Sequence, residues 1–599
     1  LTLKLWEGLN FSSSLQYEIF NSKRRDLYKE DSWVVKNPVN YYTEYNDATG
    51  VVGKSAYPTG QFLDQYTSEM QGYTFRNQVN FNRTFRRHDF NVVLGTELRH
   101  RRTTSYTSPR VYGYNDETLT SKLFPNGTGK LAIKDLFGNT ITVDDYASTF
   151  TFNTDRFFSL YGNAAYTFDN KYTISGSVRT DASNFITDDP KYRYAPFWSV
   201  GGMWNLGQES FMSDYLFIDW LRLRLTYGYN GNVDTSTSFK PLVSIGSVEN
   251  VYKHEITGSI ASFGNPELRW EKVGSVDIGI DYSFWGGKLA GKLDYYRKYS
   301  KDLIATISIS SANGTTSQKL NNAEMLNSGI ELEVGSQLDI IGKDIQWYGN
   351  VNYAYNLNRI ERLFVTDNSA KTYLRGDFKE GENASTIYAW HYAGVNKDGI
   401  PCVEEGSSPD GLRPMNTVYD NTSDATGWLR PQGVKVAPHI MGLTTGFKVY
   451  NFDLSLIVTG KFGHKFKRSS FNYPTMGKTG TSKIWVHKDV SKLLDGDKAM
   501  PPLLTDTEDS NQMYYDSYYT DAMDYLYHNA NHIRFQELNL TWHIPEVWLQ
   551  KIGFRTAAVY GQINNLGLIT ANKYKNDPEF PEGTVKPERS FIVGVKFNF

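Results

Sequence analysis

The feature that most constrains the fold of this chain is a two-residue alternation of apolar and polar side chains that recurs along its length. In the stretch LRLRLTYGYN, Leu221, Leu223 and Leu225 alternate with Arg222 and Arg224. Successive side chains of a β-strand point to opposite faces, so each such segment has one apolar and one polar face. The alternation predicts an all-β chain, and it recurs in VDIGIDYSF (276–284), GIELEVGSQL (329–338), IQWYGNVNYAYNL (345–357), FDLSLIV (452–458) and SFIVGVKFNF (590–599).

The polar face of these strands is too hydrophilic for a dry core. It carries charged groups that are costly to bury without partners, namely Asp277, Asp281, Glu331, Glu333, Arg222 and Arg224. The chain contains 42 Tyr, 34 Phe and 13 Trp, yet its mean hydropathy is −0.49. No run of about 18 apolar residues could form a transmembrane helix. Strands with hydrocarbon on one face and water on the other account for both observations.

Aromatic residues gather near the ends of the predicted strands. Such clusters are typical of the girdles at the two membrane interfaces of outer-membrane barrels. The alternative interpretation is ordinary packing of aromatic and β-branched side chains in a soluble sheet. The residues concerned are Tyr73, Phe75, Tyr166, Phe168, Trp198, Trp204, Tyr282, Phe284, Trp285, Tyr295 and Tyr296.

The connections between the strands alternate in length. Short links are RRHD (86–89), DNK (169–171), WGGK (285–288) and DIIGKD (339–344). Long polar links fall between the resulting pairs, at about 21–70, 101–156, 230–269, 300–326, 358–439 and 460–531. A transmembrane β-barrel has short periplasmic turns and long outer loops. A soluble sandwich has no reason to sort its loops in this way, and a β-propeller needs near-constant spacing.

We expect an antiparallel transmembrane β-barrel with about seventeen strands in this chain. A single-chain bacterial barrel normally has an even number of strands and begins and ends in the periplasm. An odd number therefore predicts that residues 1–599 are the C-terminal portion of a larger barrel. The approximate strand ranges are 2–7, 9–20, 71–85, 90–100, 157–168, 172–180, 196–206, 220–229, 273–284, 289–299, 328–338, 345–357, 440–449, 451–459, 533–542, 554–562 and 590–599.

The final strand has the pattern of a barrel-closure signal. Its alternating apolar residues can face lipid while its backbone pairs with the first strand, which removes an unpaired edge that lipid would not tolerate. These residues are Phe591, Val593, Val595, Phe597 and Phe599.

The sequence offers little chemistry, and we expect no enzyme, no cofactor and no metal site. The motifs GxSxG, GxxxxGK[ST], HExxH and the EF-hand loop do not occur. The single cysteine, Cys402, cannot form an internal disulfide. His528 and His532 have i,i+4 spacing, but they precede a strand and not a helix. A net charge of −2 gives no indication of a broad nucleic-acid surface.

Two loop segments are candidates for contact with a substrate or with a covering partner. YYDSYYTDAMDYLYH (514–528) interleaves tyrosines with aspartates, and tyrosines offer flat faces and hydroxyls to sugars or peptides. YAWHY (388–392) is the second candidate. The alternative interpretation is packing between loops. The candidate residues are Tyr514, Tyr515, Tyr518, Tyr519, Trp390 and His391.

Several segments, in order along the chain, resemble SusC/RagA-type TonB-dependent outer-membrane transporters. They are FDNKYTISGSVRTDASNF (168–185), DWLRLRLTYGYNGN (219–232), NPELRWEK (265–272), LDYYRKYSKDLI (293–304), NSGIELEV (327–334), IRFQELNLTWHIP (533–545) and the closing strand. The resemblance is strong from about residue 150 to 599 and weaker before it.

The resemblance implies a 22-stranded barrel that surrounds an N-terminal plug, with residues 1–599 supplying strands 6–22 and the plug absent from this chain. It also implies a SusD-like surface lipoprotein as a lid, energy from TonB–ExbB–ExbD through the missing N-terminal region, and a location in the Gram-negative outer membrane. A dimer of the transporter–lid pair is one arrangement that it allows.

The chain departs from the family pattern in two places. It has TDASNF (180–185) where relatives often have an Asp-Gly-Ser-Ser turn. Near the end, Ile533 and Phe535 lie on one parity, whereas Leu538, Leu540 and Trp542 lie on the other. A β-bulge would explain this change of phase.

Three functional hypotheses remain. The first is TonB-dependent import of oligosaccharides or oligopeptides together with a SusD-like lid. The second is a TonB-dependent receptor for a siderophore or cobalamin. The third is a secreted β-rich enzyme or adhesin, which would be soluble without detergent.

Overall fold

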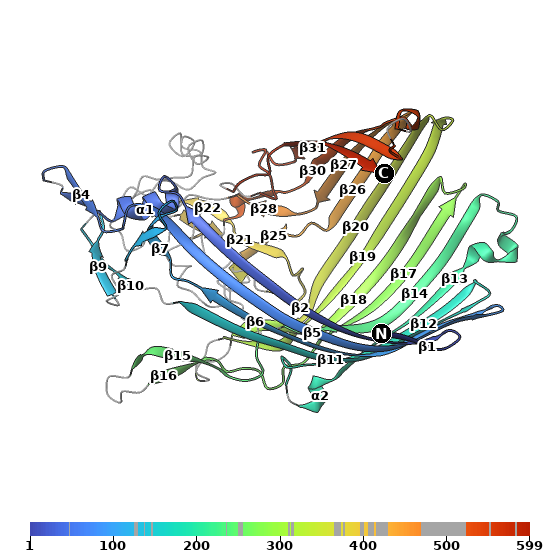
Figure 1. Cartoon of the computed structure of the whole chain (residues 1–599), viewed down its shortest axis with the longest axis horizontal. Coiled ribbons are helices and arrows are strands. Elements are labelled where there is room, and N and C mark those ends of the chain that lie inside the picture. The colour runs from blue at the N-terminus through green and yellow to red at the C-terminus, as the bar shows by residue number, and fades with distance from the viewer. Residues whose placement is uncertain are drawn as a thin grey trace. The chain divides into compact units, whose positions relative to one another are not determined.

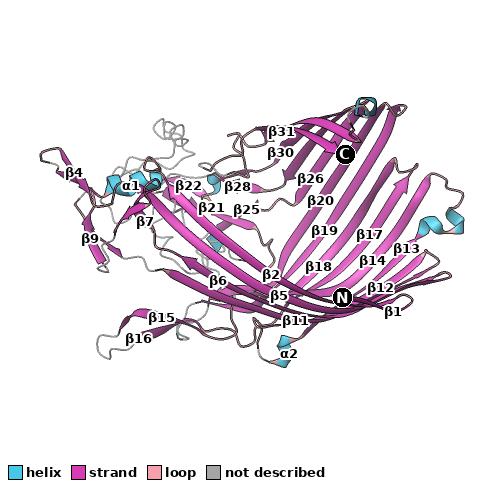
Figure 2. Cartoon of the chain, viewed as in Figure 1, coloured by secondary structure: helices cyan, strands magenta, loops and turns pink. Residues whose placement is uncertain are grey.

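The computed structural model describes most of residues 1–598. The exceptions are residues 47, 125–129, 137, 145–147, 188, 235–236, 250–255, 309–311, 313–316, 364–372, 375–377, 396–400, 405–411, 415–428, 469–522, 550–552 and 581–583. Strands predominate in the described residues (Figure 2). No helix among them is long and apolar enough to cross a membrane.

Each predicted strand has a counterpart in the structure, in the predicted order. These strands are β1 (Thr2–Trp6), β2 (Leu9–Tyr28), β5 (Gln61–Phe85), β6 (His88–Thr107), β11 (Thr149–Phe168), β12 (Tyr172–Ser183), β13 (Ala195–Asn205), β14 (Ile218–Asn232), β17 (Glu271–Phe284), β18 (Leu289–Ser308), β19 (Ser317–Ile341), β20 (Ile345–Leu363), β26 (His439–Val449), β27 (Phe452–Phe462), β30 (His532–His543), β31 (Thr556–Thr570) and β32 (Ser590–Asn598).

The long links contain short elements of their own. The strands are β3 (Thr43–Asn46), β4 (Val51–Ser55), β7 (Val111–Asn115), β8 (Thr120–Lys122), β9 (Lys130–Lys134), β10 (Thr140–Asp144), β15 (Leu242–Glu249), β16 (Ile256–Ser262), β21 (Thr386–Trp390), β22 (Tyr392–Val395), β23 (Pro401–Glu404), β24 (Leu412–Pro414), β25 (Leu429–Val434), β28 (Lys465–Lys467) and β29 (Tyr527–Asn529). The helices include α1 (Trp33–Tyr41), α2 (Pro190–Arg193) and α8 (Glu546–Leu549).

The chain divides into two compact units. Unit 1 consists of Leu1–Arg83, Val92–Gly162 and Arg179–Phe185, and unit 2 of Thr84–Asn91, Asn163–Val178 and Ile186–Phe599. In unit 1, β2 pairs antiparallel with β1 and β5, and β7 pairs with β5 and β8. In unit 2, each strand of the series β13, β14, β17, β18, β19, β20, β26, β27, β30, β31 and β32 pairs antiparallel with the next, and much of this series is visible in Figure 1.

The register of unit 2 confirms the predicted faces. Leu225 lies opposite Ile278, Ile278 opposite Tyr295, and Tyr295 opposite Ile330. All four of these large apolar side chains are exposed. One position along, the row consists of Arg224, Gly279, Asp294 and Glu331. The sheet therefore has a continuous outward apolar band and a polar opposite face, as a barrel wall between lipid and water requires.

Several strands continue beyond the predicted ranges at the end that adjoins a long link. β2 extends to Tyr28 and β5 begins at Gln61, so the predicted long link 21–70 is wrong at both ends. The added residues, such as NSKRRDLY (21–28), lack apolar alternation. Beyond the hydrocarbon layer both faces of a strand meet water, so hydrogen bonding sustains the strand without the two-residue pattern.

The short links are tight turns, as predicted. In WGGK, Trp285, Gly286 and Gly287 all have positive φ, a conformation that favours glycine. The Asp219 carboxylate accepts hydrogen bonds from the backbone N–H groups of Gly286 (2.9 Å) and Gly287 (2.7 Å) and from the Ser283 hydroxyl (2.9 Å). This acidic cap satisfies backbone donors that the turn leaves unpaired.

Among the described residues, two buried hydrophobic clusters lie where links pack against strand ends. In unit 1 the cluster comprises Val35 of α1, Phe62 of β5 and Tyr112 of β7. In unit 2 it comprises Ile186, Ala195, Leu268 and Trp270. The clusters therefore organise the loop end of the strands.

The predicted β-bulge is confirmed. Ile457 lies opposite Glu537 and Val458 opposite Phe535, so Gln536 is the additional residue on β30. The Gln536 amide donates to the Thr459 hydroxyl at 3.1 Å. The bulge shifts the parity of the apolar residues, which keeps both halves of β30 facing the same side.

Candidate functional site

The polar face of unit 2 holds an ion-pair network centred on Arg224 of β14. The Arg224 guanidinium donates to both carboxylate oxygens of Asp281 of β17 (2.9 and 2.8 Å) and to Asp294 of β18 (2.7 Å). Asp277 lies 3.8 Å away. Three carboxylates around one cation leave the cluster net negative, as suits a hydrated face.

Gly279 makes this network possible. A Cβ at that position would lie 2.4 Å from a carboxylate oxygen of Asp294 and 2.6 Å from a guanidinium nitrogen of Arg224. Both distances are shorter than van der Waals contact allows. The glycine in the middle of β17 therefore leaves room for Arg224 to cross the strand to Asp294.

The structure brings together the two loop segments that the sequence singled out. The His391 ring lies 2.5 Å from Asp524 and 3.5 Å from Glu404, measured from Nδ1 and Nε2. The rings of Tyr392 and Tyr525 meet edge-to-face at 5.7 Å, and Arg430 of β25 forms an ion pair with Glu404. We name the group His391, Glu404, Arg430 and Asp524 the loop cluster.

The predicted contact residues have different positions relative to this cluster. His391 is part of it, and its side chain is partly exposed. Trp390 is only 4% exposed, so in this structure its ring supports the loops from within. Tyr514, Tyr515, Tyr518 and Tyr519 lie outside the described residues.

The residues of the predicted closure signal lie on β32, which pairs antiparallel with β31. Phe591, Val593, Val595 and Phe597 are all exposed. Phe599 lies outside the described residues. Phe597 also contacts the ring of Phe554, at 5.2 Å between centroids.

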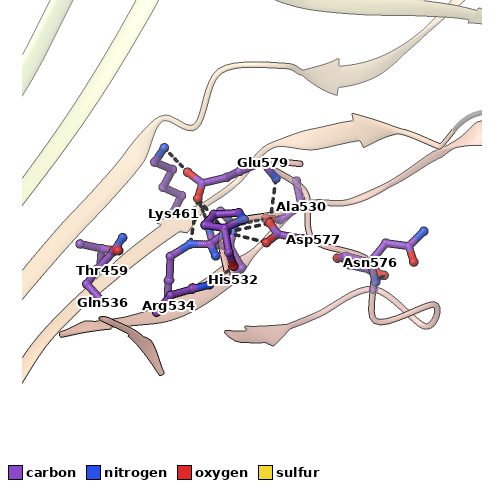
Figure 3. A network of polar contacts seen from close by, with 12 residues as sticks. Thr459, Lys461, Ala530, His532, Arg534, Gln536, Asn576, Asp577 and Glu579 are labelled. Atoms are coloured by element: carbon purple, nitrogen blue, oxygen red, sulfur yellow. Dashed lines mark hydrogen bonds and ion pairs between the residues drawn. The ribbon is translucent and has the colours of Figure 1, made fainter. Parts of the chain in front are cut away.

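A second network, which sequence reasoning missed, surrounds Arg534 of β30 (Figure 3). The Arg534 guanidinium donates to both oxygens of Asp577 (2.8 and 2.9 Å) and to Glu579 (3.0 Å). Lys461 of β27 donates to Glu579 at 2.5 Å. Arg534 is 5% exposed and Asp577 is 7% exposed. We name this group the rim network. It ties the segment between β31 and β32 to β27 and β30.

The pKa values of Glu579 in the rim network and of His464, whose ring lies 6.0 Å from that of His532, are perturbed. Burial raises the pKa of the Glu579 carboxyl, but the hydrogen bond and charge of Lys461, together with Arg534, outweigh burial and place it below its ordinary value. Burial, with smaller contributions from His532 and Lys461, lowers the pKa of His464 to about 4. The sequence signal for this network was the acidic pair in NDPEF (576–580), which follows β31.

His528, His532 and Cys402 are packed against other parts of the chain. His532 is buried, with Nδ1 2.8 Å from the carbonyl oxygen of Ala530, and the His528 ring packs against Tyr574 at 4.8 Å. Cys402 of β23 is buried. Among the described residues, no three His, Cys, Asp or Glu side chains gather as metal ligands.

Comparison with known proteins places this sheet in a family. The family model described as TonB dependent receptor-like, beta-barrel, matches residues 5–525. The chain is 24% identical to TonB-dependent receptor P3 of Formosa agariphila over 470 residues, which is 76% of this chain and 44% of that protein. It is 23% identical to TonB-dependent receptor SusC of Bacteroides thetaiotaomicron over 464 residues, which is 74% of this chain and 43% of SusC.

A solved structure of the RagAB peptide importer in the closed-closed state covers the whole chain with a TM-score of 0.74 and 19% sequence identity. The match spans 61% of that structure's chain, and the chain spans less than half the length of the two curated relatives. The predicted resemblance and fold class are thus confirmed. The chain belongs to the TonB-dependent receptor-like β-barrel family, is similar to SusC and to RagAB, and has its place in the outer membrane.

Proposed function

We propose that the protein containing this chain imports oligosaccharides or oligopeptides across the outer membrane, powered through TonB–ExbB–ExbD and covered by a SusD-like lipoprotein. In this proposal it is a transporter and not an enzyme, and residues 1–599 are the C-terminal part of the barrel. The observation that carries it is the fold match to RagAB over the whole chain, at a TM-score of 0.74. The similarity to SusC supports the same class.

The loop cluster is the proposed contact surface for the substrate or the lid. It presents a histidine, two carboxylates and an arginine within one group of loops. Tyr514, Tyr515, Tyr518 and Tyr519, which precede Asp524 in the sequence, are further proposed contacts of the substrate or the lid. Exposed ionic groups beside aromatic rings suit reversible contacts that form and release during each cycle.

The test is uptake by whole cells that carry or lack the full-length gene. Fluorescently labelled oligosaccharides and oligopeptides are supplied with and without a protonophore that dissipates the inner-membrane proton gradient. We expect uptake of one substrate class to require both the gene and the gradient, and a surface lipoprotein to co-purify with the tagged protein. Equal uptake of both classes in the deletion strain would refute import by this protein.

A further inference from the structure

A cavity of about 800 Å³ lies in unit 1, on the polar face of the outer ends of β2 and β5. Ser22, Arg24, Asp26 and Tyr28 of β2 alternate along its wall. They share the parity opposite to that of Leu15, Tyr17 and Ile19, which are exposed apolar residues. The volume falls within the range of about 300–1,000 Å³ that is typical of small-molecule sites.

The cavity contains equal numbers of positive and negative side chains. Arg110 donates to both oxygens of Asp64, at 2.7 and 2.6 Å, and its guanidinium lies over the Tyr28 ring at 5.3 Å. The side chains of Arg110 and Asp64 are each about one-third exposed. Arg24 contacts Asp26 through Nε (3.0 Å) and one terminal nitrogen (2.8 Å), but its side chain is 72% exposed, so its other terminal nitrogen can reach a ligand.

The two aspartates lie directly opposite each other on neighbouring strands. Like charges in this position repel each other, and Arg24 on Asp26 and Arg110 on Asp64 offset this repulsion. Each carboxylate has about four lone-pair sites, of which one arginine uses two. A ligand ammonium group between Asp26 and Asp64 would therefore find acceptor sites on both carboxylates.

Two of the three aromatic rings that line the cavity are engaged. The Tyr28 ring is covered by Arg110 and Tyr112 is buried against Phe62 and Phe124, whereas Tyr66, whose hydroxyl donates to Ser105, is 37% exposed. A neutral sugar relies on open aromatic faces for stacking. These engaged rings favour an ionic ligand over a neutral oligosaccharide.

We propose that this cavity is a binding subsite for short peptides with free termini, in which Arg24 receives the carboxylate and the Asp26–Asp64 pair receives the ammonium group. The inference rests on the proposed import function and selects oligopeptides, and not oligosaccharides, as the imported substrates. Arg24, Asp26 and Asp64 all line this one cavity, so both charged ends of a short peptide can be bound within it.

The test is direct binding to the purified full-length protein in detergent, measured by calorimetry. The probes are trialanine, trialanine capped by acetyl and amide groups, and maltotriose. The variants are Arg24→Gln and Asp26→Asn. The matched control is Arg83→Gln, which removes an ion pair with Glu7. Arg83 lies on β5, as Asp64 does, but it does not line the cavity.

We expect trialanine to bind and the capped peptide and maltotriose to bind at least about tenfold more weakly, because charged hydrogen bonds are lost. Arg24→Gln and Asp26→Asn should each weaken trialanine binding about tenfold, and Arg83→Gln should leave it unchanged. Equal binding of capped and free trialanine, no binding of trialanine, or unaltered binding by both cavity variants would overturn the subsite. If cells that carry the full-length gene show no gradient-dependent uptake of any substrate, the import function is refuted instead. The two failures can be told apart because the binding assay does not depend on energy coupling.

Discussion

Removal of the Arg534 side chain should release the segment between β31 and β32 from the rest of the sheet. Replacement by methionine keeps much of the volume but removes the charge and all donors. Asp577, which is 7% exposed and bonded to Arg534 at 2.8 and 2.9 Å, would then be a buried carboxylate without its cation. Breaking a buried ion pair from one side costs about 3–5 kcal/mol.

This free energy converts into a measurable change in amide exchange. At about 1.4 kcal/mol per tenfold, local opening of the segment should increase by about 100-fold to several thousand-fold. Hydrogen exchange with mass spectrometry on the full-length protein should report it at Ala571, Asn576 and Glu579, whose backbone N–H groups are hydrogen-bonded in the structure.

Two further variants make the test specific. Arg359→Met removes an exposed pair with Glu361 on one strand, which should cost at most about 1 kcal/mol. The double variant Arg534→Met/Asp577→Leu should recover protection at Ala571 and Asn576, because apolar residues can replace a buried ion pair; the Glu579 N–H loses its acceptor, the Asp577 carboxylate, in this variant. If Arg534→Met exchanges at the same rate as the Arg359→Met control, the rim network does not hold the segment.

Three other perturbations follow from the structure. Gly279→Val should lower the yield of heat-modifiable barrel, since the new Cβ would clash with the Arg224 network at a cost of about 1–3 kcal/mol. The control Gly202→Ala should leave the yield unchanged, because nothing lies within 4 Å of its new Cβ. Val593→Arg on the outward face of β32 should reduce assembled barrel in gels, by up to about 2–4 kcal/mol, and Ile592→Arg on the opposite face should do so less; equal losses would contradict the assignment of faces. The pKa of His464 is about 4, below about 6.5 in the unfolded chain. The unfolded chain therefore binds more protons between these values, and the unfolding temperature should fall as pH drops from 6.5 to 4; His464→Phe should flatten that dependence, and an unchanged slope would exclude this group as its source.

In the proposed function, the chemistry of the loops decides which lid and which substrate the barrel binds. The loop cluster and the cavity of unit 1 are built from ionic side chains that come from separate links and strand ends. The barrel wall could serve many substrates, because a shared scaffold does not define its ligand. The uptake and binding assays together assign the substrate class to these surfaces.

The sequence alone determined the strands, their order, their two faces and the presence of a bulge between Phe535 and Leu538, because side-chain alternation is a local property of the backbone; the structure places that bulge at Gln536. It also placed the short turns, where residues such as Gly286 adopt positive φ. It did not define the outer ends of β2 and β5, where water on both faces leaves no pattern to read.

Only the tertiary structure decided which charges meet. Arg534 and Asp577 are 43 positions apart and His391 and Asp524 are 133 apart, and no local pattern links either pair. The cavity beside Arg24 likewise depends on the link before β7 folding back over β2 and β5. Contacts of this kind depend on how distant segments pack, whereas strands and faces are set within a few residues.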